Sequence, residues 1–183
     1  MTFRCFGNND ELYAYYHDNI WGKPVYDDKT LFEYLILEGA QAGLSWITIL
    51  KRQKEYQKAF DNFDFYKISE YDENKISELM NNKGIIRNKR KIISTIKNAK
   101  CFIKIINEYG SFSNYLWRFV NNKPIINNYK RIEDIPVYDD LALKISKDLR
   151  KRGFSFVGPT IIYSYLQAVG VINDHLQQCE FKY

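Results

Sequence analysis

Apolar residues recur along most of the chain at the three- and four-residue intervals of an α-helix. The clearest stripe predicts a helix from about 87 to 109, with steps of 4, 3, 4 and 3 between Ile92, Ile96, Ala99, Ile103 and Ile106. A second stripe near the C-terminus passes through Ile162, Tyr165, Val169 and Ile172. Further helical stretches are expected near 10–18, 28–42, 45–60, 73–81, 112–121 and 139–152. Because no alternating strand pattern of any length appears, the chain is predicted to be all-α.

The chain is expected to form one domain spanning 1–183. Its 183 residues suffice for a substantial core, and the 45% hydrophobic and 27% charged residues are typical of a globular protein. Only four prolines and nine glycines interrupt the helical pattern. We find no internal repeat and no linker rich in glycine, serine or proline that would divide the chain.

Charge and cysteine content limit the cellular context. A net charge of +5 mildly favours a polyanionic partner, although it also suits many proteins without one. No basic start followed by an apolar stretch indicates a secretory signal, and three cysteines argue against a disulfide framework. The nearly uncharged stretch between Glu33 and Lys51 is short for a membrane span and contains Glu38. We therefore expect a cytoplasmic protein with no membrane partner.

Glu38 lies on the face of its predicted helix that should point into the core. On the helix from Asp28, the stripe runs through Leu31, Leu35, Glu38 and Ala42. A buried carboxylate is costly unless it is hydrogen-bonded or paired. Glu38 is therefore either a structural acid bonded to a backbone donor or buried tyrosine, or the floor of a pocket that accepts hydrogen bonds from a ligand. The sequence leaves both interpretations open.

Aromatic residues cluster on both sides of Glu38. Tyr13, Tyr15, Tyr16 and Trp21 precede it, and Trp46 follows it by eight residues, about two turns if the helix does not break at Gly43. Such clusters usually belong to a core. Tyrosine and tryptophan also pack flat and offer a polar edge, as a pocket for a planar base requires.

The two histidines of the chain each lie near a cysteine. Eleven residues separate Cys5 from His17, and three separate His175 from Cys179, a spacing that on one helical turn would point both side chains the same way. Two cysteines and two histidines are a typical ligand set for structural zinc, which would tie the N-terminus to the C-terminus. Coincidence is the alternative, since neither pair forms a C-x-x-C knuckle. Cys101 is expected to be a plain buried thiol.

The segment "LMNNKGIIRNKRKI", residues 79–92, predicts two helices joined by a tight hairpin. Gly84 is expected to adopt a left-handed conformation, with Ile85 and Ile86 anchoring the turn. Backbone N–H groups surrounded by positive charge would suit a DNA phosphate. The basic side chains are Arg87, Lys89, Arg90 and Lys91. The alternative is an ordinary solvated helix start.

Three long blocks of the sequence resemble the DNA-3-methyladenine glycosylase I family, of the helix-hairpin-helix DNA glycosylase superfamily. They are "YHDNIWGKPVYDDKTLFEYLILEGAQAGLSWITILKRQ", "GIIRNKRKI" and "RKRGFSFVGPTIIYSYLQAVGVINDH", and the resemblance extends from Cys5 to Cys179. It implies structural zinc held by Cys5, His17, His175 and Cys179. It also implies that Glu38 and Tyr16 recognise and act on the extruded base, in a pocket with Trp46, Trp21 and Tyr13. The hairpin residues Gly84, Ile86, Arg87, Lys89 and Lys91 would contact the DNA backbone.

One departure from the family pattern lies beside the first zinc cysteine. Family members carry a tryptophan two residues after this cysteine, which helps to stack the base. Here the nearest aromatic residue is Phe6, directly after Cys5, so the identity of the stacking residue stays open.

The activity that the resemblance implies is hydrolytic excision of 3-methyladenine from alkylated double-stranded DNA by a monomeric enzyme, without strand cleavage. Free 3-methyladenine would be the product. The base must be flipped out of the duplex, and methylation at N3 makes the nucleoside a cation with a good leaving group. An anionic Glu38 would favour that cation over neutral adenine, with cation–π attraction from aromatic walls. No Asp lies between Asp72 and Asp134, which fits an enzyme that relies on a labile substrate.

Two other classes of function fit parts of the sequence. A catalytically silent helix-hairpin-helix DNA-binding module would need the basic hairpin but not Glu38 among aromatic residues. A zinc-stabilised protein-interaction domain would need neither the pocket nor the basic hairpin.

Overall fold

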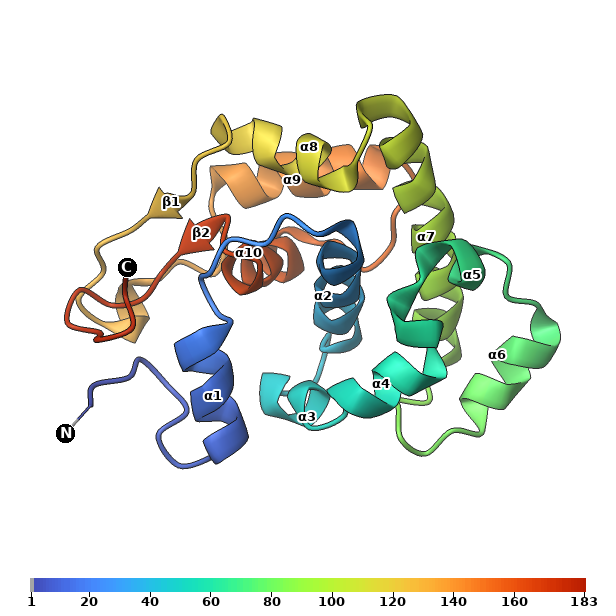
Figure 1. Ribbon diagram of the computed structural model, residues 1–183, viewed down its shortest axis with the longest axis horizontal. Helices are drawn as coiled ribbons and strands as arrows, with labels where there is room; N and C mark the ends of the chain where they lie inside the picture. The colour runs from blue at the N-terminus through green and yellow to red at the C-terminus, as the bar shows by residue number, and fades with distance from the viewer. Residues whose placement is uncertain (1) are drawn as a thin grey trace.

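The structure, a computed structural model, describes residues 2–183 and is mostly helical (Figure 1). Its α-helices are α1 Glu11–Asn19, α2 Asp28–Ala40, α3 Trp46–Leu50, α4 Gln53–Ala59, α5 Phe65–Ser69, α6 Glu73–Met80, α7 Lys89–Tyr109, α8 Phe112–Trp117, α9 Asp140–Lys151 and α10 Pro159–Ala168. Short 3₁₀-helices occupy Asp61–Phe63, Arg118–Val120 and Ile132–Asp134. Two two-residue strands are β1 Ile125–Ile126 and β2 Ile172–Asn173.

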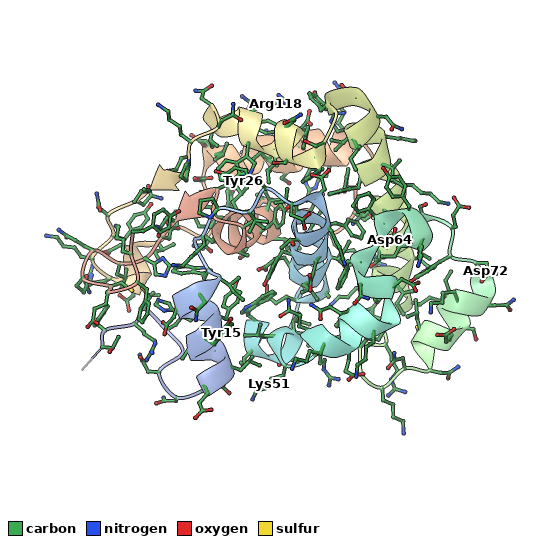
Figure 2. All side chains as sticks on the ribbon, in the orientation of Figure 1. Tyr15, Tyr26, Lys51, Asp64, Asp72 and Arg118 are labelled. Atoms are coloured by element: carbon green, nitrogen blue, oxygen red, sulfur yellow. The ribbon has the colours of Figure 1, made fainter. Side chains whose placement is uncertain are left out.

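Helix α2 is the centre of the fold. Every residue from 31 to 40 is buried, because α10, α7, α8 and α3 all pack against this helix (Figure 1). The core contains the aromatic rings of Phe32, Phe102 and Phe112, whereas charged side chains such as Lys51 and Arg118 lie on the outside (Figure 2). Burial of Glu38 therefore follows from the central position of α2 as a whole, rather than from one apolar stripe.

Side-chain caps determine where many helices begin. The carboxylates of Asp10, Asp27, Asp72 and Asp139 each accept a hydrogen bond from a backbone N–H in the first turn of α1, α2, α6 and α9. Asn88 does the same for α7, so the long predicted helix begins two residues later than its apolar stripe suggested. These caps supply partners for N–H groups that have no carbonyl partner within the helix.

Several helices differ from the sequence-based expectation. The predicted helix over 45–60 is two helices, α3 and α4, separated at Lys51–Arg52, and α5 was not anticipated. The C-terminal stripe ends with α10 at Ala168. Gly170 has a positive φ of 70°, and a Cβ there would lie 2.1 Å from the backbone of Lys23, so the chain turns out of the helix at this point.

The strictly all-α expectation was wrong in one detail. Strands β1 and β2 pair in parallel, with Ile125 opposite Ile172 and Ile126 opposite Asn173. Strands of two residues are too short to produce an alternating pattern in the sequence. Their pairing brings the segment before α9 beside the C-terminal tail (Figure 1).

The stretch considered as a membrane span is the central helix of the core. Among residues 2–183, no helix combines the length and apolar character needed to cross a bilayer.

Candidate functional site

A cavity of about 330 Å³ opens beside the last turn of α2. Its walls come from α1, α3, α10 and the segment before α9, which are far apart in the sequence. The lining residues are Phe6, Tyr13, Tyr16, Trp21, Glu38, Gln41, Trp46, Ile132, Ile135, Ser164 and Gln167. All six predicted base-pocket residues are therefore brought together in one place.

Glu38 faces this cavity without a protein partner. Its side chain is buried, with 3% of the residue exposed, and none of the hydrogen bonds among residues 2–183 involves its carboxylate. Burial raises the pKa of Glu38 to about 8, which favours its neutral form at pH 7. An ionised carboxylate, as expected from the sequence, therefore requires a positive charge nearby.

Glu33 provides an internal comparison on the same helix. It is also buried, but its carboxylate accepts hydrogen bonds from Gln53 at 3.0 Å and from Gln57 at 2.7 Å. Glu33 is thus a structural acid satisfied by the protein. Glu38 does not fit that interpretation, and the ligand-binding alternative is favoured.

Aromatic rings form the walls next to Glu38. The ring of Phe6 lies 4.8 Å from that of Tyr13 and 4.9 Å from that of Trp21, and Tyr16 lies 5.4 Å from Trp46 between ring centroids. Phe6 therefore stands at the corner where a stacking residue was sought. Tyr15, by contrast, is exposed on the outside (Figure 2).

Trp46 lines the cavity, but it does not lie on the same helix as Glu38. The chain breaks at Gly43, which has a φ of 81°, and Trp46 begins the separate helix α3. The Trp46 Nε1 atom is buried and has no hydrogen-bond partner among residues 2–183. An unpaired buried N–H is costly, so this donor is suited to an acceptor on a ligand.

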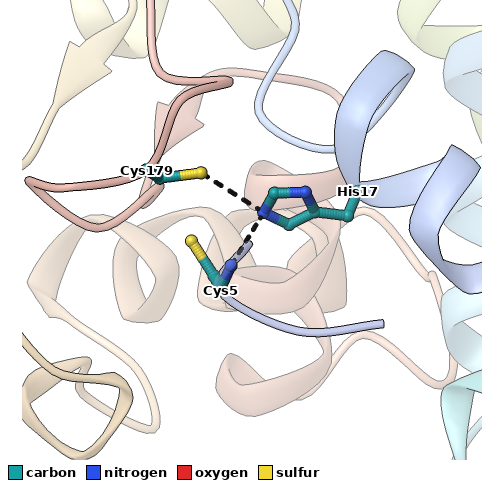
Figure 3. A group of neighbouring side chains, drawn as sticks. All are labelled: Cys5, His17 and Cys179. Carbon is teal, nitrogen blue, oxygen red and sulfur yellow. Dashed lines mark hydrogen bonds between the residues drawn. The ribbon is translucent and has the colours of Figure 1, made fainter. Parts of the chain in front are cut away.

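Cys5, His17 and Cys179 converge into a candidate metal centre (Figure 3). Their potential ligand atoms all lie within 4.8 Å of one another. His17 Nε2 is 3.6 Å from the Cys179 sulfur and accepts a hydrogen bond from the Cys5 N–H at 3.2 Å. The three side chains come from the N-terminal segment, α1 and the C-terminal tail, as expected for a site that joins the two ends.

His175 lies beside this group but not in the predicted local structure. The tail after β2 is irregular, so His175 and Cys179 do not share a helical turn, and that part of the expectation was wrong. The His175 ring centroid is 4.8 Å from that of His17, and its Nε2 is 3.2 Å from the His17 carbonyl oxygen. Burial lowers the pKa of His175 to about 4, which keeps the imidazole in the neutral form that binds metals.

Hydrogen-bond partners fix the orientation of both imidazoles. The Nδ1 atom of His17 lies 2.8 Å from Asp18, and Nδ1 of His175 lies 2.9 Å from the side-chain oxygen of Asn173. Arg4 in turn binds both carboxylate oxygens of Asp18. With Nδ1 as donor, Nε2 of His17 carries the lone pair, which is the arrangement common around metal sites. His175 Nε2 instead faces the His17 carbonyl oxygen, which only accepts hydrogen bonds. Cys5, His17 and Cys179 are therefore the residues that the structure brings together as a group that could hold a metal ion.

The hairpin between α6 and α7 lies where it was predicted, but the conformation of Gly84 and the hydrogen bonds of the turn differ from the expectation. Gly84 does not have a positive φ; it is needed because a Cβ there would lie 2.9 Å from Glu55 Cβ. Its N–H donates to Asn82, and the N–H of Ile86 donates to the Tyr56 hydroxyl. These two N–H groups, expected to face a phosphate, are bonded within the protein.

Lys91 also departs from the expectation of a phosphate contact. Its ammonium group donates to the carbonyl oxygens of Ala40 at 2.8 Å and Ala42 at 2.7 Å, at the C-terminal end of α2. Cations are stabilised there by the helix dipole. Arg87, Lys89 and Arg90 are exposed and carry the positive charge of the hairpin surface.

Comparison with known proteins connects this geometry to a family. The family model described as methyladenine glycosylase matches residues 6–183. The chain belongs to the methyladenine glycosylase family. It is 42% identical over its full length to the DNA-3-methyladenine glycosylase of Haemophilus influenzae, of which it covers 99%.

Solved structures of family members have nearly the same backbone. A variant of 3-methyladenine DNA glycosylase I in complex with 3-methyladenine superimposes with a TM-score of 0.96 at 40% identity, covering 100% of this chain and 98% of that one. The 3-methyladenine DNA glycosylase I of Staphylococcus aureus gives a TM-score of 0.95 at 41% identity, covering 98% and 95%. The mostly helical fold is therefore shared with methyladenine glycosylases.

Five cavity residues were not predicted from the sequence. Gln41 follows Glu38 by three residues, and this spacing on one helix could have revealed it. Ser164, Gln167, Ile132 and Ile135 gave no local signal. They line the pocket of this methyladenine glycosylase because α10 packs on α2 and the segment before α9 reaches the same cavity.

Proposed function

We propose that this protein is a DNA-3-methyladenine glycosylase that flips 3-methyladenine out of alkylated double-stranded DNA and hydrolyses its N-glycosidic bond, with no strand-cleaving lyase step. The observation that carries the proposal is the buried carboxylate of Glu38, which faces an aromatic cavity without a protein partner. Relatives named for this activity, one in complex with 3-methyladenine, support it.

Selectivity comes from charge. The nucleoside of 3-methyladenine is a cation, whereas that of adenine is neutral. A cation beside Glu38 offsets the burial that raises its pKa to about 8, so the carboxyl loses its proton as the damaged base enters. Neutral adenine gives no such compensation, and it is also better stacked in the duplex and harder to extract.

Tyr16 acts with Glu38 in the catalytic site. Burial, followed by the nearby charge of Glu38, raises the pKa of the Tyr16 hydroxyl well above its usual range. Tyr16 therefore stays neutral and can donate a hydrogen bond. Phe6, Tyr13, Trp21 and Trp46 form flat walls that stack on the base and attract its positive charge.

Phosphates bind at the hairpin surface, in a helix-hairpin-helix architecture. The exposed side chains of Arg87 and Lys89 supply the contacts, while Gly84 and Ile86 shape the turn that presents them. Lys91 is omitted from the proposed contacts because its ammonium binds the end of α2.

The proposed protein also binds a structural zinc ion. Cys5, His17, His175 and Cys179 would hold it, and the ion would cross-link the N-terminal and C-terminal segments without taking part in the reaction. We further propose that residues 1–183 act as one domain, as a monomer, in the cytoplasm.

The test is release of 3-methyladenine from methylated duplex DNA, comparing the native protein with Glu38→Gln. The Gln variant keeps the shape and removes the charge, and we expect release to fall by about 100-fold or more. Glu33→Gln is the matched control, since it makes the same change on the same helix at an acid that the protein itself satisfies. Absence of release by the native protein would overturn the proposal.

A further inference from the structure

Helix α10 contributes polar side chains to the cavity that Glu38 faces. Ser164 and Gln167 are three residues apart on α10, and both line the cavity. Glu38 lies on α2, against which α10 packs. A planar base in the cavity would therefore meet polar groups from two helices.

Gln167 is held by a carboxylate that lies behind the cavity wall. Its Nε2 donates to Asp174 Oδ2 at 2.9 Å. Asp174 is fully buried and also accepts hydrogen bonds from Asn127, at 2.7 Å, and from the hydroxyl of Tyr163. Asn127 follows β1 and Asp174 follows β2, so the parallel strand pair builds this network.

The network determines which end of the Gln167 amide is free. A carboxylate oxygen only accepts hydrogen bonds, so the amide must turn its NH₂ group toward Asp174. The side-chain carbonyl oxygen is then the other end of the amide. No hydrogen bond among residues 2–183 uses this oxygen.

We propose that Gln167, oriented by Asp174, presents its side-chain carbonyl oxygen to the extruded base and, together with Glu38, selects a purine with an exocyclic amino group over one with a carbonyl group. This inference rests on the proposed function and names the chemical feature by which the same site recognises its base. Gln167 is the specificity-determining residue, and Asp174 is a positioning residue.

The donor and acceptor pattern of the cavity matches adenine. The exocyclic amino group of adenine donates hydrogen bonds, and ring nitrogens beside it accept them. Glu38 and Gln167 offer acceptors for the amino group, and the neutral hydroxyl of Tyr16 offers a donor for a ring nitrogen. A carbonyl at the same ring position would face the Gln167 oxygen and leave it unpaired, which a site built from buried polar groups disfavours.

The experiment measures the affinity of free 3-methyladenine and of 3-methylhypoxanthine, the same purine with a carbonyl in place of the amino group, by calorimetry. The native protein should bind 3-methyladenine more tightly by about 10-fold or more, and Gln167→Met should reduce this ratio to about 3-fold or less. Asp174→Asn, which removes the constraint on the amide, should reduce the ratio in the same direction. General structural damage would weaken the binding of both bases alike and leave the ratio of their affinities unchanged.

Gln57→Met is the matched control. Gln57 also donates its amide nitrogen to a carboxylate, that of Glu33, but it lies outside the cavity. The ratio should stay near the native value in this variant. An unchanged ratio in Gln167→Met, or an equal change in Gln57→Met, would overturn the inference while 3-methyladenine release by the native protein still supported the proposed function. Failure of the native protein to release the base would count against the proposed function itself.

Discussion

At the scale of single residues, the partner of a buried acid distinguishes structure from function. Glu33 and Glu38 lie five residues apart on α2 and are both buried. Two glutamines satisfy Glu33, whereas no residue of the described chain donates a hydrogen bond to Glu38. The raised pKa of Glu38 is the electrostatic result, and it makes the site responsive to a positive charge.

The pH dependence of catalysis should report this carboxyl. Glu38 with a pKa of about 8 is neutral below that pH and ionised above it, and the cationic base requires the ionised form. We expect kcat/KM for 3-methyladenine release to rise as the pH approaches 8, to reach half its maximum near pH 8, and to level off above it. Glu38→Gln should have a low, flat profile. A native profile without this rise would contradict the role of Glu38.

Stability should depend on pH in the opposite direction. Because the folded state binds a proton more tightly at Glu38 than the unfolded state does, the stability that this group contributes is complete below the ordinary glutamate pKa. It is lost as the pH rises toward about 8. Glu38→Gln should therefore unfold at a higher temperature than the native protein at pH 8.5. The expected gain in unfolding free energy is roughly 2–4 kcal/mol. Near pH 4.5 the two midpoints in thermal denaturation should be similar.

At the scale of elements, we expect the loop between α2 and α3 to contact the DNA. Leu44 is 38% exposed at its tip, next to Gly43, where a φ of 81° turns the chain outward. A second hollow, of about 430 Å³, adjoins the cavity here and shares Gln41 and Ser164 with it. An exposed apolar side chain beside the base pocket can fill the gap that a flipped base leaves.

We expect Leu44→Ala to reduce release of 3-methyladenine from duplex DNA by about 10-fold, and to leave release from methylated single strands nearly unchanged, because only the duplex needs the gap to be filled. Val137→Ala changes another exposed apolar residue, outside the cavity, and should affect neither substrate. Equal losses on both substrates would show that Leu44 does not act on the duplex.

The hairpin offers a test that separates phosphate contacts from packing. Arg87→Ala and Lys89→Ala should each reduce the slope of log affinity against log salt concentration by roughly 1. Lys91→Met should leave that slope unchanged and instead cost about 1–2 kcal/mol of stability, because two carbonyl oxygens at the end of α2 lose their donor. A reduced slope in Lys91→Met would restore it as a phosphate contact.

At the scale of the whole molecule, the two ends of the chain meet. The N-terminal segment carries Cys5, the C-terminal tail carries Cys179, and both lie next to His17 of α1, on the side of the molecule where the termini are marked (Figures 1 and 3). A metal ion at this point would close the chain on itself. It would also support Trp21, which lies between the aromatic cavity and the histidine rings.

Purified protein should contain about one zinc ion per chain by elemental analysis. Chelation, or Cys179→Ser, should remove the ion and lower the unfolding temperature by roughly 10 °C or more. Cys101→Ser is the control, since Cys101 is buried outside the cluster and should leave the metal content unchanged. A folded native protein without metal would exclude the four-ligand site.

What the sequence alone determines here is mostly local. The apolar periodicity predicts α6, α7 and α9 to within a few residues, because i, i+3 and i+4 neighbours share one helix face whatever surrounds them. The long motif blocks identify the family, and with it Glu38, the aromatic pocket residues and the candidate metal ligands.

Only the tertiary structure decides what each of these groups touches. It separates the satisfied Glu33 from the unpartnered Glu38, turns Lys91 inward, and brings Gln167 of α10 to a cavity that begins at Phe6. The two-residue strands and the irregular tail at His175 also depend on contacts between distant segments. Periodicity describes a helix and its buried face, whereas hydrogen-bond partners and cavity walls depend on which helices pack together.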